Sequence, residues 1–103
     1  MLFMVIERFA NGDPARVGKR FQERGRLLPD GVDYVTSWLT LDGAICYQVM
    51  EAADASLIET WTRQWDDLAS FEIDPVQTSA DFWATFTPRL APVVTPSGVE
   101  GQP

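Results

Sequence analysis

The chain has 103 residues, of which 46% are hydrophobic, 22% charged and 12% aromatic, a length and composition typical of one folded domain and too apolar for a disordered protein. It contains eight basic and fifteen acidic residues, and its formal net charge is −7. This charge disfavours binding to nucleic acid or to an anionic membrane surface, so we expect neither as a partner.

The first quarter of the chain predicts a strand followed by a helix. Residues 2–9, LFMVIERF, are apolar at alternate positions on both faces, as in a strand that is covered on both sides. The turn NGDP follows, with Asp13 as the expected N-cap and Pro14 at the first helical position. The helix should run from about residue 14 to residue 28, where LPDG ends it.

The middle of the chain predicts a β-hairpin. Residues 32–41 and 44–51 are rich in β-branched and aromatic side chains. Asp42 and Gly43 join them, and this pair of residues is typical of a two-residue hairpin turn. We therefore expect two antiparallel strands here.

A second helix and a fourth strand follow the hairpin. Asp54 is the expected N-cap of a helix that runs to about residue 68. Its apolar residues share one face: Leu57, Ile58, Trp61, Trp65 and Leu68. Residues 70–78 predict a strand that Pro75 confines to a sheet edge. Ser79 is then the expected cap of a short helix, ADFWATF.

This order of elements predicts an α+β fold. It is the ferredoxin-like βαββαβ arrangement, in which a four-stranded antiparallel sheet carries two helices on one face. Residues 1–87 form the expected single domain. Residues 88–103 contain four prolines and two glycines, which predicts an extended or disordered C-terminal tail.

The expected sheet has more apolar surface than two helices can cover. In the second strand, Val35, Leu39 and Leu41 alternate with Tyr34 and Trp38, so both faces are apolar. An open face of this kind is too large to leave in water. We therefore predict a homodimer in which two sheets pack face to face and form a dimeric α+β barrel.

The residue types that the chain lacks exclude several kinds of chemistry. There is no histidine, and Cys46 is the one cysteine. Zinc sites, histidine-ligated haem and Ser-His-Asp catalysis therefore have no ligands or base, and an internal disulfide cannot form. We expect no metal and no other cofactor. The N-terminal stretch MLFMVIERF is charged too early for a signal peptide, so we expect a cytoplasmic protein.

Three stretches, MLFMVIERF, RFQERGRLLPDGVDYVTSW and WDDLASFEIDPVQTS, resemble the bacterial domain-of-unknown-function family numbered 3303, within the wider group of dimeric α+β barrels. The resemblance covers residues 1–80. It implies the fold and the dimer but no catalytic residues. The wider group includes cofactor-free monooxygenases, muconolactone isomerases, haem-handling enzymes and stress-response proteins, so the fold leaves the chemistry open. Histidine-dependent members are poor templates for a chain without histidine.

Arg24 is the first candidate ligand-binding residue. On a helical wheel it lies within the apolar stripe of Val17, Phe21 and Leu28, which directs its guanidinium towards the sheet. Four other basic residues lie off this stripe or at its margin: Arg16, Lys19, Arg20 and Arg26. Arg24 would either pair with a buried carboxylate or reach the edge of the helix, or it would bind an anionic ligand.

Glu7 is an acid within the apolar first strand, with Arg8 on the opposite face. Burial without a partner would raise the pKa of Glu7 and would suit a general acid or base. The more common role of such a residue is one half of a structural ion pair. Arg24 is the partner that we expect for it.

Four residues with polar tips lie on the two hairpin strands: Tyr34, Trp38, Tyr47 and Gln48. Core packing is the first interpretation of the aromatic residues. In the second interpretation, Tyr34, Trp38 and Gln48 line a pocket between sheet and helices, and Tyr47 is a weak catalytic candidate beside Glu7. Cys46 is expected to be an inert buried thiol.

Three functions are consistent with these residues. The favoured one is a protein that binds a small apolar or anionic metabolite. The alternatives are a cofactor-independent isomerase, cyclase or monooxygenase, and a purely structural dimerisation module. An enzyme needs a cavity of roughly a few hundred cubic ångströms that an acid or base with a shifted pKa can reach. A binding protein needs the cavity alone, and a structural module needs none.

Overall fold

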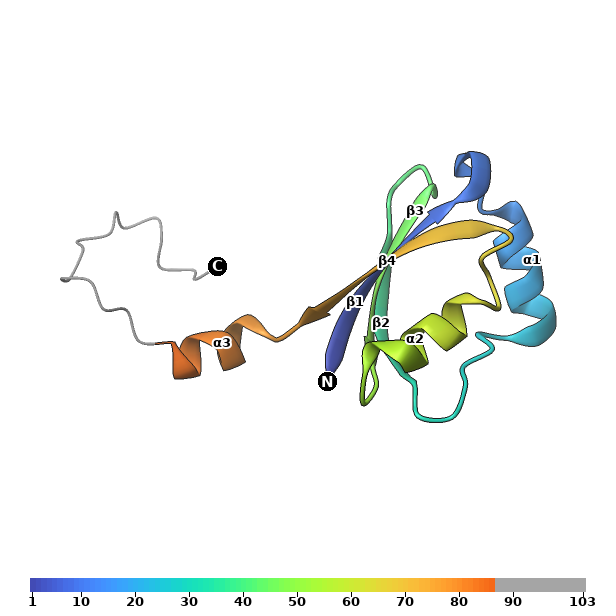
Figure 1. Cartoon of the computed structure of the whole chain (residues 1–103). Helices are drawn as coiled ribbons and strands as arrows, with labels where there is room; N and C mark the ends of the chain where they lie inside the picture. Colours follow the sequence, from blue (N-terminus) through green and yellow to red (C-terminus); the bar gives the residue numbers. More distant parts are fainter. Residues whose placement is uncertain (87–103) are drawn as a thin grey trace.

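A computed structural model of the chain describes residues 1–86 (Figure 1). The elements are β1 (Leu2–Phe9), a short 3-10 turn η1 (Ala10–Gly12), α1 (Ala15–Arg24), β2 (Asp33–Leu39), β3 (Ile45–Glu51), α2 (Ala55–Thr62), β4 (Ala69–Val76) and α3 (Ser79–Thr85). The predicted order of four strands and three helices is confirmed. The tail predicted for residues 88–103 lies outside the described residues.

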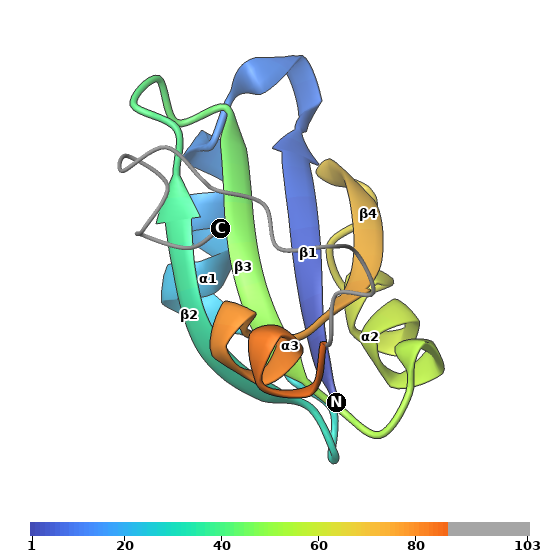
Figure 2. The same cartoon turned by 90° about the vertical axis from the view of Figure 1, so that its left-hand side faces the viewer.

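The four strands form one antiparallel sheet with the order β2-β3-β1-β4. Helices α1 and α2 lie on one face of this sheet, while no helix of residues 1–86 packs against the other face (Figures 1 and 2). Strand β4 is at an edge, as Pro75 predicts. The α+β class and the antiparallel sheet with two helices on one face are therefore confirmed.

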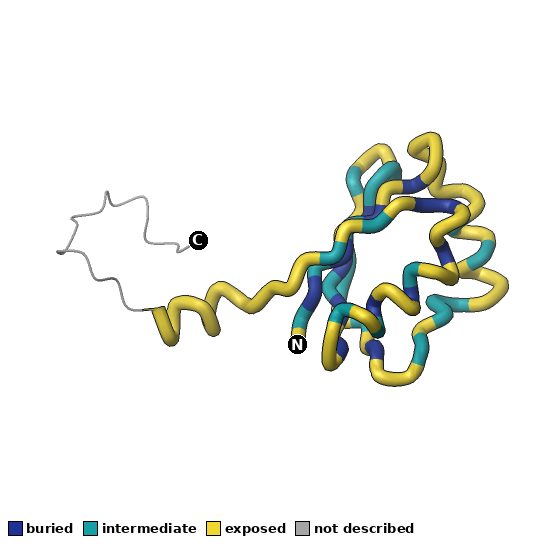
Figure 3. Tube along the Cα trace, in the orientation of Figure 1, coloured by how far each residue is buried: buried dark blue, intermediate teal, exposed yellow. Residues whose placement is uncertain are grey.

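The core lies between the sheet and α2. Phe3 and Val5 of β1, Met50 of β3 and Ile58 of α2 are the largest fully buried side chains. Trp61, Trp65 and Leu68 are also buried, which confirms the predicted apolar face. Figure 3 shows that most positions along α1 are exposed, in contrast to β1, β3 and α2. The stability of the domain therefore rests on the packing of α2 against the sheet.

Helix α1 is shorter than predicted at its C-terminal end. Gly25 adopts a φ of +72°, and its N–H donates to the Phe21 carbonyl at 2.7 Å. A glycine in this left-handed region commonly ends a helix, so the predicted extension to residue 28 is wrong. At the other end Pro14 is the N-cap residue, and Asp13 Oδ1 accepts a hydrogen bond from the Ala15 N–H at 2.9 Å.

Three further boundaries differ from the prediction. Helix α2 begins at the predicted cap, where Asp54 Oδ1 accepts from the Ser56 N–H at 3.0 Å, but it ends at Thr62 and continues as turns. Thr78, rather than Ser79, caps α3. The hairpin loop is wider than two residues, because the Thr40 N–H donates to the Ile45 carbonyl at 2.9 Å.

A β-bulge in β2 overturns the predicted alternation of that strand. The pairing register shifts between Tyr34, which lies opposite Met50, and Thr36, which lies opposite Val49. The bulge inserts Val35 as an extra residue. Tyr34 and Trp38 were predicted on the same face, but the bulge places them on opposite faces of the sheet.

The sheet face away from α1 and α2 carries many apolar side chains, together with charged ones such as Arg8, Glu51, Glu72 and Asp74. Its exposed or half-buried apolar residues, which we call the open face, are Leu2, Met4, Ile6, Trp38, Ile45, Tyr47, Val49 and Val76. Helix α3 stands off the sheet on this side (Figures 1 and 2). None of its residues is buried, and the rings of Phe82 and Trp83 pack on each other and on Phe86, which follows the helix. None of the helices in residues 1–86 has the length and apolar character that crossing a bilayer requires.

Candidate functional site

A cavity of about 240 Å³ lies between α1 and the helix-covered face of the sheet. Strands β1, β2 and β3 form its floor, α1 forms its roof, and Trp61 and Trp65 form one wall. Most of the lining is apolar. A purely structural dimerisation module needs no cavity. A binding protein and an enzyme both need one.

Glu7 and Gln48 are the buried polar residues of the floor. Both are 5% exposed, and Gln48 Nε2 donates to Glu7 Oε1 at 3.2 Å. They come from adjacent strands, because Glu7 lies opposite Cys46 in the register and Gln48 is two residues further along β3. Burial raises the pKa of Glu7 from 4.5 to about 7. At neutral pH this carboxyl group is therefore close to half protonated and can either donate or accept a proton.

Cys46 and Ser37 lie beside this pair on the floor. Burial is the main cause that raises the pKa of the Cys46 thiol to about 11, and the negative charge of Glu7 adds to it. The thiol is therefore neutral and a poor nucleophile. This confirms that Cys46 is a buried thiol, as expected.

Helix α1 covers the cavity without burying its own side chains. Val17, Gly18 and Phe21 line the cavity from this helix, yet no residue of α1 is buried. The helix is connected through residues with positive φ on both sides, Asn11 before it and Gly25 after it. Its contact with the sheet is therefore weaker than that of α2.

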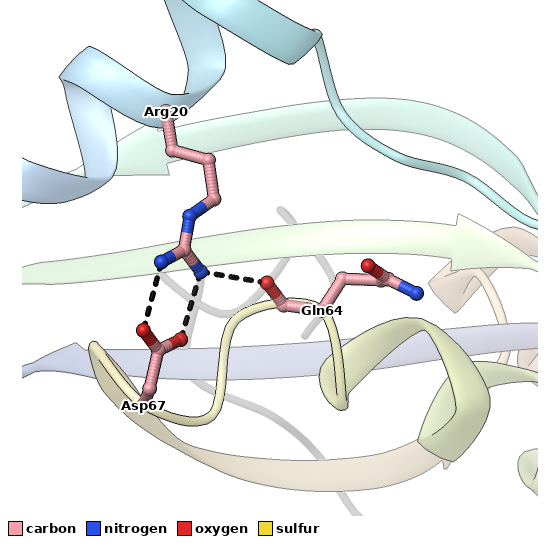
Figure 4. A network of polar contacts seen from close by, with 3 residues as sticks. All are labelled: Arg20, Gln64 and Asp67. Atoms are coloured by element: carbon pink, nitrogen blue, oxygen red, sulfur yellow. Dashed lines mark hydrogen bonds and ion pairs between the residues drawn. The ribbon is translucent and has the colours of Figure 1, made fainter.

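An ion pair holds α1 to the segment that follows α2 (Figure 4). The two terminal nitrogens of Arg20 donate to the two carboxylate oxygens of Asp67, each at 2.7 Å, and Nη1 also donates to the Gln64 carbonyl at 2.8 Å. The hydrogen bond from Arg20 is the main cause that lowers the pKa of Asp67 to about 2. This bidentate contact joins α1, the roof of the cavity, to the turn that follows α2.

Arg26 lies at the cavity in a sharply turned segment. Its backbone carbonyl accepts the indole N–H groups of Trp61, at 2.8 Å, and Trp65, at 3.1 Å. Both neighbours have positive φ, +72° at Gly25 and +60° at Leu27. Such a φ is costly for a leucine, and strained backbone of this kind is concentrated at functional sites. The two indoles hold the strained segment in place.

The predicted pair of Glu7 and Arg24 is not formed. Arg24 is exposed and is not among the residues that line the cavity. The wheel placed Arg24 inside an apolar stripe by including Leu28, but α1 ends at Arg24 and Leu28 lies outside the helix. Within residues 1–86, the hydrogen bond from Gln48 is the one that the Glu7 side chain makes.

The hairpin residues are divided between the two sheet faces. Gln48 lines the cavity, and its role in ligand binding stays a prediction. Tyr34 is on the same face and donates to or accepts from Ser37 Oγ at 2.6 Å. Trp38 and Tyr47 lie opposite each other on the open face, away from the cavity. The structure therefore brings Glu7 and Gln48 together, with Tyr34 nearby, and separates Trp38 and Tyr47 from them.

Two arginines with clear contacts at the site were not predicted from the sequence. On the predicted long helix, Arg26 lies well off the apolar stripe and Arg20 lies at its margin. The signal that was missed is Gly25, because a glycine near the end of a helical pattern commonly stops it. Because α1 ends at Arg24, a helical wheel cannot predict the direction of the Arg26 side chain. The pairing of Arg20 with Asp67 joins residues far apart in the sequence, and no local pattern indicates it.

The polar groups of this site fit an organic ligand better than a metal. Residues 1–86 contain no cluster of three or more cysteine, aspartate or glutamate side chains that could hold a metal ion. The cavity offers one carboxyl, one amide, one hydroxyl, one thiol and one guanidinium among apolar side chains. A few polar groups in an apolar pocket are typical of sites that orient a small molecule.

Comparison with known proteins identifies the family of the chain. No curated protein and no solved structure matches it. Residues 1–90 match the family described as Domain of unknown function (DUF3303), the family indicated by the resemblance in the sequence. Because this match spans most of the 103 residues, the protein belongs to the DUF3303 family.

Proposed function

We propose that this protein binds a small, mostly apolar molecule in the cavity between α1 and the sheet. The observation that carries the proposal is the buried pair of Glu7 and Gln48 on the floor of an otherwise apolar cavity of about 240 Å³. Burying a carboxyl with a single hydrogen-bond partner costs stability. Binding of a ligand that contacts the Glu7 carboxyl would explain why the protein keeps this costly buried group.

A pair of matched variants tests the binding proposal. Ser37→Leu adds bulk on the cavity floor, whereas Ser70→Leu makes the same change at an exposed position of β4. Neutral single-ring compounds such as benzyl alcohol are titrated into each protein, and the NMR signal of the Gln48 side-chain amide is followed. We expect binding to the wild type and to Ser70→Leu but not to Ser37→Leu. The proposal would be refuted if neither neutral nor anionic single-ring compounds bound the wild type at millimolar concentration.

A cofactor-independent enzyme is the second candidate. The specific observation in its favour is the pKa of Glu7, which burial raises to about 7, near the value that suits proton transfer at neutral pH. Glu7 would be the acid or base in an isomerase, cyclase or monooxygenase. Tyr47 is on the other sheet face and no longer supports this role. Glu7→Gln should then abolish turnover of a bound substrate while the substrate still binds.

We also propose that the domain is a ferredoxin-like fold that dimerises through the open face. Five aromatic rings on this side of the sheet are 36 to 58% exposed: Trp38, Tyr47, Phe82, Trp83 and Phe86. Together they offer roughly 400 Å² per copy, about half of the ~800 Å² that each partner contributes to a standard interface. The aliphatic side chains of the open face add to this area. Two copies would form the dimeric α+β barrel. The bacterial origin of the protein and its cytoplasmic location also stay predictions.

A further inference from the structure

Arg26 is a half-buried cation without an acidic partner in the described part of the chain. Residues 1–86 contain three ion pairs, which join the Met1 N-terminus to Glu51, Arg8 to Glu72 and Arg20 to Asp67. Arg26 takes part in none of them, although acidic residues outnumber basic ones by fifteen to eight. Partial burial of a guanidinium without a counter-ion is unfavourable. The missing counter-ion is therefore a feature that a bound anion would explain.

The guanidinium of Arg26 is held in position before any ligand arrives. Its Cζ lies 3.4 Å from the ring centroid of Tyr34 and 5.1 Å from that of Phe21. Stacking on an aromatic ring occupies the flat face of a guanidinium and leaves its N–H edge available for hydrogen bonds in the plane. The two indole bonds to the Arg26 carbonyl fix the backbone of the same residue. This arrangement reduces the entropy cost of binding an anion.

We infer that the ligand is a small monocarboxylate with an apolar, single-ring body, whose carboxylate pairs with the N–H edge of Arg26. The inference rests on the proposed binding function of the same cavity. A volume of about 240 Å³ is below the roughly 300 to 1,000 Å³ of sites for drug-sized ligands, which limits the body to about one ring.

The charges around the cavity favour a monoanion over a phosphate. Arg26 is the one cationic residue among those that line the cavity, and Glu7 contributes a carboxyl group to the floor. A phosphate carries up to two negative charges and needs several donors, which these residues do not offer. A carboxylate needs one guanidinium edge, and its ring can contact Phe9, Phe21 and Trp61.

Two probes of the same size separate charge from shape. Benzoate and benzyl alcohol each carry one ring, and only benzoate is charged. Both are titrated by calorimetry into the wild type, Arg26→Met and Arg24→Met. The last variant is the matched control, because Arg24 is an exposed arginine two residues away that does not line the cavity. We expect benzoate to bind the wild type and Arg24→Met at least roughly tenfold more tightly than benzyl alcohol, and Arg26→Met to lose this preference.

The possible results distinguish the inference from the proposal on which it rests. Equal binding of both probes to the wild type would overturn the carboxylate inference and leave the binding cavity in place. Binding of neither probe would overturn both. An equal loss of preference in Arg24→Met and Arg26→Met would show a general charge effect and overturn the role of Arg26. The comparison of probes on the wild type decides the ligand class even if Arg26→Met does not fold.

Discussion

Gln48 gives Glu7 its one side-chain hydrogen bond within residues 1–86, from Nε2 to Oε1 at 3.2 Å. A neutral amide cannot offset the cost of ionising a buried carboxyl in the way that a cation would. The pKa of Glu7 is consequently raised by burial to about 7. The same pair is therefore both the polar centre of the cavity and a source of pH dependence.

Glu7→Gln should remove a pH-dependent loss of stability. The folded chain keeps the Glu7 proton to a higher pH than the unfolded chain, so the folded state binds more protons between pH 4.5 and about 7. The free energy of unfolding then falls as the pH rises through this window, by on the order of 3 kcal/mol. Urea unfolding at about pH 5 and about pH 8 measures this change. We expect Glu7→Gln to exceed the wild type in stability at the higher pH only.

Glu59→Gln is the control for this experiment, because Glu59 lies on the exposed side of α2. It should follow the wild type at both pH values. If Glu7→Gln and the wild type lose stability equally between the two pH values, the pKa of Glu7 is not raised.

Breaking the contact between Arg20 and Asp67 should loosen α1. We expect hydrogen exchange of the α1 amides to become several-fold faster in Arg20→Met and in Asp67→Asn, with little change in β1. Lys19→Met removes a neighbouring exposed charge and should leave the exchange unchanged. Because the pKa of Asp67 is lowered to about 2, the stability from this pair is present above pH 3.8 and is lost as the pH falls through about 2. Unchanged α1 exchange in both variants would show that the ion pair does not hold the helix.

Two glycines should respond to alanine in opposite directions. Gly18 is within α1 and a Cβ added there would meet no atom within 4 Å, so Gly18→Ala should raise the free energy of unfolding by roughly 0.5 to 1 kcal/mol. Gly43 has a φ of +74°, and its new Cβ would lie 3.3 Å from Pro14 Cγ. Gly43→Ala should lower the free energy by roughly 1 to 2 kcal/mol. Urea unfolding checks both, and a stability loss in Gly18→Ala would contradict the geometry of α1.

Trp38→Glu should separate the proposed dimer. Trp38 is 58% exposed on the open face, so a charge there costs little in the monomer but would be buried between two sheets. Leu41→Glu is the control, because Leu41 is fully exposed in the hairpin loop outside this face. Light scattering after gel filtration should give a dimer for the wild type and Leu41→Glu, and a monomer for Trp38→Glu. A wild-type monomer at micromolar concentration would refute the dimer.

The sequence predicts the elements of this fold better than their ends. Alternating apolar residues identify β1 within its observed bounds, and the apolar spacing of Ile58, Trp61 and Trp65 identifies the face that α2 and the following turn bury. These patterns can be read from the sequence because the residues of one element that face the core are apolar at regular spacing. The end of α1 was missed because the wheel was continued past Gly25. The bulge at Val35 could not be predicted, since it depends on how β2 pairs with β3.

The sequence predicts only those residues of the candidate site that lie on regular strands. Glu7 stands out as an acid in an apolar strand, and Gln48 as a polar residue in another, and the structure places both on the cavity floor. Arg26 reaches the cavity from an irregular segment whose path depends on the two indoles that bind its carbonyl. Such a contact between distant segments leaves no periodic signal in the sequence.

The exposed character of α1 has an evolutionary consequence. The packed residues that hold the fold belong mainly to β1, β3, α2 and the turn after it, whereas Gly18 and Phe21 shape the cavity from exposed positions of α1. Large losses of stability come from changes in packed cores, so substitutions at these exposed positions should cost less stability than substitutions in the core. Selection can thus adapt one scaffold to new ligands by varying a single helix. Members of the family that differ in α1 should differ in the molecules that they accept while they keep the same sheet.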